Sequence, residues 1–574
     1  MLKLLRYLKK YTVQCIIAPL FKLLEVCFEL MVPLIVSSVI DIGIYKENTD
    51  YIVKMVLVLV AFAVTGLSCT LIAQYFSAKA AVGFGCDLRA KLFRKIESFS
   101  YSQLDKIGTS TLLTRLTGDI NQVTTGVNLT LRLLLRSPFV VFGAMIMAFT
   151  VDVKSALIFT VAIPVLAVII FVIIFLTVPL YKKTQSSLDE VVAKTDENLR
   201  GVRVVRAFCK EEEDIKEFAE KNATLYRTQI FVGKISAILN PATVIIVNLA
   251  IVGLIYSGAV RVNTGILTTG QVVALYNYMT QILVELIKFA NLVITVSKSV
   301  ACGNRIQNIL EIEPDLTSGN ITEIGSSDTV VELSNVTLNY REGEPALSDI
   351  SLQIKKGETV GIIGATGSGK TSLVNLIPRF YDATDGEVSV FGVNVKDYDI
   401  DTLRLIVGIV PQSNALFKGS LRENMKIAKA DALDSEIFSA LKVAQIADFV
   451  DSREEGLDLM IEQGGKNLSG GQRQRINIAR TVLKAPKILV LDDSSSALDY
   501  ATDAALRASI KSLNVDGAVI IVSQRASAIM NADKIIVLED GKIVAVGTDE
   551  TLKETCEIYR EIRDTQFYKE GTSL

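Results

Sequence analysis

The residues with the clearest chemistry form a glycine-rich segment, 364–371, with the sequence Gly-Ala-Thr-Gly-Ser-Gly-Lys-Thr. It matches the phosphate-binding pattern G-x-x-x-x-G-K-[ST]. The apolar segment 358–363 before it predicts a buried strand, and 372–377 after it has helical spacing. Backbone N–H groups of such a loop bind phosphate, aided by the dipole of the following helix. The residues expected to surround a nucleotide here are Gly364, Ala365, Thr366, Gly367, Ser368, Gly369, Lys370, Thr371 and Ser372.

A second acidic segment is expected to complete this site. Residues 487–491 are mostly apolar and end in Asp492 and Asp493, which predicts a buried strand with two carboxylates at its end. Mg²⁺ prefers oxygen ligands close to the phosphates. We therefore expect Lys370 to reach the β- and γ-phosphates, and Thr371 and Asp492 to bind Mg²⁺. Between the two segments lies Leu-Ser-Gly-Gly-Gln, at 468–472.

Together these motifs resemble the nucleotide-binding domain of ABC transporters, in which LSGGQ is a family motif. The resemblance implies that ATP and Mg²⁺ bind here, and that two such domains pair head to tail. Each ATP then lies between the phosphate loop of one chain and the LSGGQ of the other. By the same resemblance, Tyr340 stacks on adenine, although an ordinary strand tyrosine is the alternative, and Gln412 contacts Mg²⁺. The residues expected to act on the partner's ATP are Ser469, Gly470, Gly471 and Gln472.

Composition divides the chain in two. The 574 residues are 50% hydrophobic with a mean hydropathy of +0.40, and the apolar excess lies almost entirely in the first 300 residues. This predicts a membrane domain followed by a soluble domain. A net charge of −2 gives no reason to expect nucleic acid as a partner. The seven cysteines are scattered, which suggests reduced thiols, and there is no histidine at all.

Six stretches are long and apolar enough to span a bilayer. The basic N-terminal segment leads into the first of them, which we interpret as a retained span and not a cleaved signal peptide. The connections after the second and fourth stretches are long and rich in Lys and Arg, which places them and both termini in the cytosol. The predicted spans lie at about 14–42, 53–80, 126–150, 156–180, 235–260 and 266–299.

The predicted fold is thus a bundle of six transmembrane helices, as in type I ABC exporters, followed by an α/β P-loop ATPase domain. We expect the membrane domain at 1–300, a polar linker at 301–328 and the nucleotide-binding domain at 329–574. In type I exporters the cytosolic extensions carry short coupling helices that dock on the ATPase domains. The segments 108–119 and 197–208 resemble them.

Several ionisable residues fall at or near membrane depth. Such groups are costly against lipid, so we expect them to face the interior of the bundle or an aqueous cavity. Two pairs have the i,i+3 spacing of an ion pair on one helix. Structural pairing and contact with a substrate remain equal alternatives for these residues, which are Lys22, Glu25, Glu29, Arg132, Arg136, Glu285 and Lys288.

Two residues depart from the family pattern. Most ABC ATPases carry a Glu directly after the Mg²⁺-binding aspartate, where it polarises the attacking water, and here the residue is Asp493. The family also has a His that contacts the γ-phosphate, and Gln524 holds that position. Gln cannot carry an imidazolium charge or transfer a proton near neutral pH. The phosphate loop and LSGGQ are intact, so we expect a site that binds ATP well and hydrolyses it weakly.

This combination predicts one subunit of a heterodimeric ABC exporter whose partner is a different half-transporter carrying the Glu and the His. Asp493 and Gln524 would be the catalytic-site residues of this chain's own degenerate site. The expected cargo is a drug or another amphipathic compound, moved out of the cytoplasm across a bacterial plasma membrane. The alternatives are an ABC importer on the same fold and an ATP-gated regulator or channel.

Overall fold

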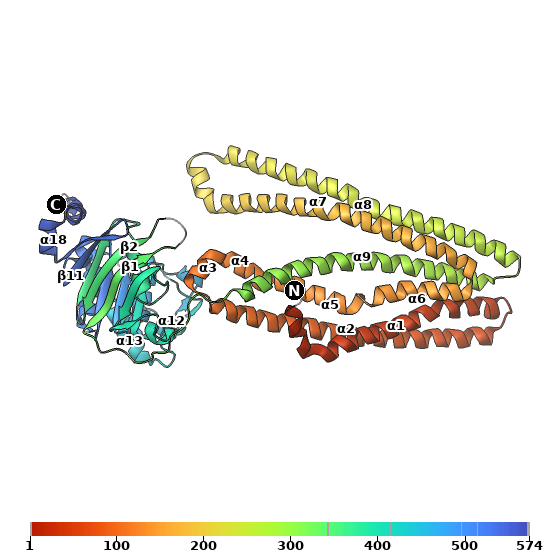
Figure 1. Ribbon diagram of the computed structural model, residues 1–574, viewed down its shortest axis with the longest axis horizontal. Helices are drawn as coiled ribbons and strands as arrows, with labels where there is room; N and C mark the ends of the chain where they lie inside the picture. The colour runs from red at the N-terminus through yellow and green to blue at the C-terminus, as the bar shows by residue number, and fades with distance from the viewer. Residues whose placement is uncertain (1–2, 341–343, 414, 495, 514, 571–574) are drawn as a thin grey trace. The chain divides into compact units, whose positions relative to one another are not determined.

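The computed structural model describes residues 3–340, 344–413, 415–494, 496–513 and 515–570. The chain forms two compact units, shown in Figure 1. The helical unit comprises Met1–Glu97 and Ser110–Glu313, and the sheet unit comprises Ser98–Thr109 and Pro314–Leu574. Residues 98–109 thus belong with the C-terminal half of the sequence.

Six helical stretches among the described residues are long and apolar enough to cross a membrane. This confirms the predicted six-helix membrane region. Each stretch continues past the apolar core that the sequence indicates, because its polar extension keeps helical spacing. The stretches are Leu4–Ile44, Thr49–Glu97, Thr109–Val151, Val153–Ala207, Glu211–Asn263 and Thr269–Glu311.

The helical unit consists almost entirely of α-helices. A 3₁₀ helix, Leu4–Tyr11, precedes the first α-helix, and π-helical turns lie at Val39–Ile44 and Arg115–Asp119. The α-helices are α1 (Thr12–Ser38), α2 (Thr49–Glu97), α4 (Thr109–Thr114), α5 (Ile120–Leu133), α6 (Arg136–Val151), α7 (Val153–Ala207), α8 (Glu211–Asn263) and α9 (Thr269–Glu311).

Within this unit α1 packs along α2, α7 packs along α8, and α9 lies against α5 and α6 (Figure 1). Buried side chains from α1, α6, α7, α8 and α9 form one apolar core. Tyr278 of α9 is fully buried in this core, and its hydroxyl donates to the backbone carbonyl of Leu30 at 2.7 Å. That bond satisfies the one polar atom of a side chain otherwise suited to an apolar interior.

The third predicted span is broken in the structure. The sequence predicts one helix over about 126–150, whereas α5 ends at Leu133 and α6 begins at Arg136. Pro138 lies in the first turn of α6 and has no N–H to donate to the carbonyl of residue 134, so the hydrogen-bond ladder is interrupted there. The break places Arg136 at the start of a new helix.

The sheet unit is built on a six-stranded sheet in the order β12-β11-β3-β10-β9-β6, in which only β12 is antiparallel to its neighbour. A four-stranded antiparallel sheet, β2-β1-β4-β5, and the short pair β7-β8 complete it. The strands are β1 (Thr329–Leu338), β2 (Leu347–Lys355), β3 (Thr359–Gly364), β4 (Asp385–Val390), β5 (Val393–Asn394), β6 (Val407–Val410), β7 (Gly419–Ser420), β8 (Met460–Ile461), β9 (Ile488–Asp492), β10 (Ala518–Val522), β11 (Lys534–Glu539) and β12 (Lys542–Gly547).

The central strands are almost wholly buried, which explains their continuous apolar sequences. Their buried side chains join two apolar clusters. The helices of the unit are α3 (Tyr101–Ile107), α10 (Lys370–Leu376), α11 (Ile400–Ile406), α12 (Leu421–Lys426), α13 (Asp434–Val443), α14 (Ala447–Asp451), α15 (Gly470–Leu483), α16 (Tyr500–Ser512), α17 (Ala526–Ile529), α18 (Asp549–Thr555) and α19 (Glu557–Glu570), with 3₁₀ turns at Gly456–Asp458 and Gln463–Gly465.

Helix α3 is the part of the first long connection that packs on the sheet unit. A capping box between Ser100 and Gln103 begins it, and Gly108, at φ +82°, ends it. The Tyr101 ring lies 4.7 Å from that of Phe380, and the Tyr381 hydroxyl donates to Asp105 Oδ2 at 2.8 Å. Burial, together with this bond, raises the pKa of Tyr381, so the hydroxyl remains a donor at neutral pH.

Three expectations from the sequence are corrected here. The docking segment predicted at 108–119 lies mostly in the helical unit, and the part of this connection that belongs to the sheet unit is Ser98–Thr109. The second predicted segment, 197–208, is the end of α7 in the helical unit and not a separate short helix. Helix α9 also continues to Glu311, so the first part of the predicted linker, 301–328, is helical.

We expect Tyr381 to hold α3 on the sheet unit through both its ring and its hydroxyl. Tyr381→Phe should increase the hydrogen exchange of the α3 amides by a few-fold, because one hydrogen bond is worth about 1 kcal/mol. Tyr381→Ala should increase it further by removing the ring contacts. Val544→Ala, on the exposed face of β12, is the control. Unchanged exchange in both Tyr381 variants would contradict this account.

Candidate nucleotide site

The glycine-rich loop follows β3 and leads into α10, as the sequence predicts. Gly367 and Gly369 have φ angles of +87° and +94°, which only glycine adopts without strain. A Cβ on Gly364 would lie 2.1 Å from the carbonyl oxygen of Leu538, so a side chain has no room there. These glycines let the backbone turn tightly into the helix, which leaves N–H groups at the start of α10 for an anion.

Lys370 is buried within the loop. Its Nζ donates to the carbonyl oxygens of Gly364 and Ala365 at 2.8 and 2.6 Å, and to Ser368 Oγ at 3.3 Å. Burial lowers the pKa of Lys370, against the opposing effect of the carboxylates of Asp493 and Asp492. A phosphate would add the anionic partner that a buried ammonium lacks among these neutral oxygens.

Two oxygen ligands suited to Mg²⁺ meet at the end of β9. Thr371 Oγ1 donates to Asp492 Oδ1 at 3.2 Å, and Asp492 is almost fully buried. Burial raises the pKa of Asp492, and the bond from Thr371 partly offsets this. A hydroxyl and a buried carboxylate in contact fit a hard cation that keeps its remaining ligands from water and phosphate. Thr371 and Asp492 would hold Mg²⁺, which neutralises charge on the phosphates.

The next residue, Asp493, has an unusual backbone that its neighbours hold in place. Its φ is +49°, its N–H donates to the Val522 carbonyl at 3.0 Å, and its carbonyl accepts from Gln474 Nε2 at 3.1 Å. Burial raises the pKa of Asp493, and a hydrogen bond from the Gln412 side chain lowers it in part. The structure therefore brings the predicted Gln412 and Asp493 together.

Gln524 follows β10, the neighbour of β9, so it lies at the same sheet edge as Asp493. Its side chain is exposed, and its backbone carbonyl accepts a hydrogen bond from Gln566 Nε2 at 2.8 Å. The preceding residue, Ser523, is buried, and its backbone N–H donates to the Ile362 carbonyl at 3.0 Å. This bond ties the segment to the strand that carries the phosphate loop.

Tyr340 lies beside the start of α10. Its hydroxyl donates to Ser372 Oγ at 3.0 Å, and its ring meets that of Tyr381 edge-on at 4.9 Å. Burial raises the pKa of Tyr340, and the bond to Ser372 opposes this. The ring is therefore held next to the phosphate loop while part of the side chain remains exposed, as a platform for a base requires.

The LSGGQ segment forms the beginning of α15. Ser469 is the N-cap, with its Oγ accepting from the Gln472 backbone N–H at 3.2 Å, while Gln472 Oε1 accepts from the Ser469 N–H at 2.9 Å. Ser469 is exposed, and a Cβ on Gly471 would lie 3.0 Å from the Ala497 carbonyl oxygen. The segment thus presents a capped helix start to the surface of the sheet unit, with its polar groups bonded to one another.

Two side chains that the sequence motifs do not indicate join these motifs. Gln474 is almost fully buried and bridges the Asp493 carbonyl and the Ala497 N–H, at 3.1 and 3.3 Å. Arg525 donates to the carbonyls of Leu498 and Ser496 at 3.2 and 3.1 Å. All four partner atoms are backbone atoms, which no residue pattern specifies. The one available signal is that Gln474 lies on the apolar face of its helix.

Known protein families and relatives match both units of the chain. Residues 15–286 match the family model for the ABC transporter transmembrane region, and residues 347–496 match the model for ABC transporter. The chain is 34% identical over its whole length to an uncharacterized ABC transporter ATP-binding protein, YfiB, of Bacillus subtilis, and the match covers 100% of both proteins. The chain therefore belongs to the ABC transporter family, and it combines a multi-pass membrane domain with one ATP-hydrolysing domain.

Other relatives have more specific names. The chain is 31% identical to a putative multidrug export ATP-binding/permease protein, YgaD, of Bacillus subtilis, over 98% of each chain. It is 30% identical to an ATP-dependent lipid A-core flippase of Syntrophus aciditrophicus, over 84% of this chain and 80% of the other. A bacterial Atm1-family ABC exporter with ATP bound shares the fold, with a TM-score of 0.81 at 21% identity and 99% coverage of each chain.

Substitutions of Tyr340 should separate ring stacking from the hydroxyl bond to Ser372. Tyr340→Ala should weaken ATP binding by about tenfold, the usual worth of a base–aromatic stack, whereas Tyr340→Phe should change it little. Titration of the full chain with a fluorescent ATP analogue measures both. Tyr398→Phe, a buried hydroxyl deletion elsewhere in the unit, is the control. Equal losses in the Phe and Ala variants would mean that the hydroxyl, and not the ring, matters.

Proposed function

We propose that this chain is one half of a heterodimeric, ATP-driven exporter of drugs or other amphipathic compounds. It binds ATP at a weakly hydrolytic site of its own and supplies LSGGQ to the catalytic site of a different partner chain. The observation that carries the proposal is the pair of substitutions at one sheet edge, Asp493 for Glu and Gln524 for His. The names of the multidrug export and lipid flippase relatives support export of an amphipathic cargo.

The fixed backbone of Asp493 supports weak hydrolysis at this site. Its N–H donates to the Val522 carbonyl, and its carbonyl accepts from Gln474 and Ser496, so a backbone shift cannot compensate for the missing methylene. A base misplaced by about 1 Å can cost about a hundredfold in rate. Gln524 adds no proton-transfer group near neutral pH. The contacts that bind nucleotide, at Lys370, Thr371 and Asp492, do not depend on either residue.

The exposed helix start at Ser469 supports the role in trans. Preorganised donors facing a transferring phosphoryl group stabilise its developing charge. In the proposed heterodimer Ser469, Gly470, Gly471 and Gln472 face the partner's ATP, while Tyr340 and the phosphate loop bind this chain's own ATP. In the proposal the ATPase domain lies in the cytosol and the helical unit in the plasma membrane; the Lys- and Arg-rich long connections support the cytosolic side for the ATPase domain.

Restoring the family residues should restore hydrolysis. In the chain purified without a partner, Asp493→Glu combined with Gln524→His should raise ATP turnover by about tenfold to a hundredfold, because the base regains its reach. Asp493→Asn with Gln524→His is the matched control and should stay slow. Turnover of the unmodified chain at the rate of the double variant would contradict the proposal of a weakly hydrolytic site.

Two single variants should separate the sites in the assembled transporter, purified through a tag on this chain. Ser469→Arg should lower total turnover by about a hundredfold, since it adds bulk and charge where the partner's phosphate binds. It should leave ATP bound at the Lys370 site. Lys370→Ala should empty that site and spare part of the turnover. Photo-crosslinked ATP, mapped to each chain, measures the occupancy.

Ser512→Arg makes the same change on an exposed residue of α16 and serves as the control for Ser469→Arg. Loss of ATP from the Lys370 site in the Ser469 variant, with turnover preserved, would mean that the signature acts in cis and that the head-to-tail assignment is wrong.

A further inference from the structure

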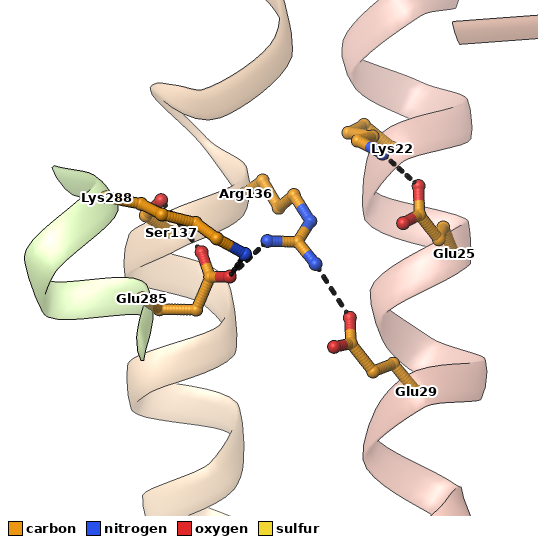
Figure 2. Close-up of polar contacts among 7 residues, drawn as sticks. All are labelled: Lys22, Glu25, Glu29, Arg136, Ser137, Glu285 and Lys288. Carbon is orange, nitrogen blue, oxygen red and sulfur yellow. Dashed lines mark hydrogen bonds and ion pairs between the residues drawn. The ribbon is translucent and has the colours of Figure 1, made fainter. Parts of the chain in front are cut away.

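The helical unit contains a chain of ion pairs across three helices, shown in Figure 2. Arg136 at the start of α6 is buried between two carboxylates: it donates to Glu285 of α9 and, at 2.8 Å, to Glu29 Oε2 of α1. Lys288 Nζ donates to Glu285 Oε1 at 2.8 Å. Lys22 and Glu25 of α1 form a separate pair at 2.5 Å. The cluster holds three cations and three carboxylates, so its net charge is zero.

Glu285 has no oxygen left for a ligand, and Arg136, Lys22 and Glu25 are largely buried. Glu285 is only 3% exposed, and its two oxygens accept from Arg136, Lys288 and Ser137. The side chain of Arg136 is 8% exposed. The Lys22–Glu25 pair is also largely buried. A buried charge needs an oppositely charged partner, and each of these buried residues has one. The pairs therefore have a structural role in holding the helices together.

Glu29 and Lys288, the first and last residues in the series Glu29–Arg136–Glu285–Lys288, are more exposed than the other members of the cluster. Their side chains are 37% and 46% exposed, and both line a cavity of about 410 Å³ between α1 and α9. The remaining oxygen of Glu29, Oε1, has no hydrogen-bond partner among the described residues. Lys288 uses one of its three N–H groups. The cavity thus offers one free carboxylate oxygen on α1 and one partly free ammonium on α9.

The rest of the cavity wall is mixed in polarity. Gln281 contributes an amide oxygen, Oε1, that is buried without a hydrogen-bond partner among the described residues. Asn277 adds a second amide, and Val32, Pro33 and Val284 form apolar wall. Pockets of this size with a few convergent polar groups on an apolar wall are typical of small-molecule sites.

We propose that this cavity binds the zwitterionic head of an amphipathic cargo, with a cationic nitrogen at Glu29 and an anionic acid group at Lys288. The inference rests on the proposed transport function and names its cargo class. A purely cationic head would leave its charge beside the Lys288 ammonium, and a purely anionic head beside the Glu29 carboxylate. A zwitterion satisfies both and brings no net charge to membrane depth, where an uncompensated charge is costly. The amide oxygen of Gln281 is a further acceptor for the cationic group.

Three probes with one tail and different heads test the charge pattern: dodecyl phosphoethanolamine, dodecylamine and dodecyl phosphate. Each competes, below its micellar concentration, with a photoreactive dodecyl phosphoethanolamine for the assembled transporter in lipid nanodiscs. We expect the zwitterion to compete best. Glu29→Gln should weaken it by about tenfold and remove its advantage over dodecyl phosphate, since a charge-assisted hydrogen bond is lost. Lys288→Gln should remove its advantage over dodecylamine.

The paired variant Lys22→Gln/Glu25→Gln is the control, because it removes a cation and a carboxylate outside the cavity. It should preserve the order of the three probes, and unfolding midpoints should confirm that all variants fold. A purely structural role for Glu29 and Lys288 would weaken all three probes equally. That result, or an order unaffected by either variant, would overturn the proposal.

A second arm identifies the source of the zwitterion and separates this inference from the transport function. Liposomes report ATP-dependent movement of a fluorescent short-chain phosphatidylethanolamine, of a phosphatidylglycerol analogue and of dodecyl phosphoethanolamine. Movement of the first favours a bilayer lipid, and movement of dodecyl phosphoethanolamine alone favours a small molecule; both support the site. Head-selective crosslinking without ATP-dependent movement would refute the proposed export but not the site. ATP-dependent movement that ignores the head group would refute the cargo class but not export.

Discussion

The parallel pairing of β10 with both β3 and β9 is the constraint on which the nucleotide site depends. Val522 lies opposite Ile362 on one side and Asp492 on the other. Because the carboxyl ends of parallel strands meet at one edge of a sheet, the phosphate loop and the two aspartates come to that edge together. Residues separated by more than a hundred positions in sequence, such as Thr371 and Asp492, are thereby brought within hydrogen-bond distance.

At this edge hydrogen bonds hold the backbone of Asp493, so the reach of its carboxylate depends on the length of its side chain. Asp493 has a left-handed backbone conformation and hydrogen bonds on both its N–H and its carbonyl. A carboxylate on such a backbone reaches only as far as its own side chain allows. The Gln474 bridge also links this residue to the LSGGQ helix and to the segment at Ala497. The weak hydrolysis proposed for this site rests on that limited reach.

In the helical unit the main constraint is the free-energy cost of ionised groups at membrane depth. Arg136 could not be buried without the carboxylates of Glu29 and Glu285, which come from two other helices. The break at 134–135 begins α6 at this arginine and so places it where both can reach. Each buried charge has an oppositely charged partner, and the most exposed members of the cluster are Glu29 and Lys288.

The sequence by itself determined the features that depend on short stretches of chain. The phosphate loop, the buried strand before Asp492, the LSGGQ helix start and the six apolar spans each follow from local spacing or from solvation of one segment. The substitutions at Asp493 and Gln524 are also visible there, because they occupy positions fixed within motifs.

Only the tertiary structure decided which distant groups meet. It showed that α3 belongs to the sheet unit, that α9 extends into the predicted linker, and that Gln474 and Arg525 bond to backbone atoms of other motifs. It also gave ion-pair partners to six of the membrane charges, which are Lys22, Glu25, Glu29, Arg136, Glu285 and Lys288. The physical reason is that periodicity reports the environment of a residue, whereas the partner of a charge or a carbonyl depends on how helices and strands far apart in the chain pack together.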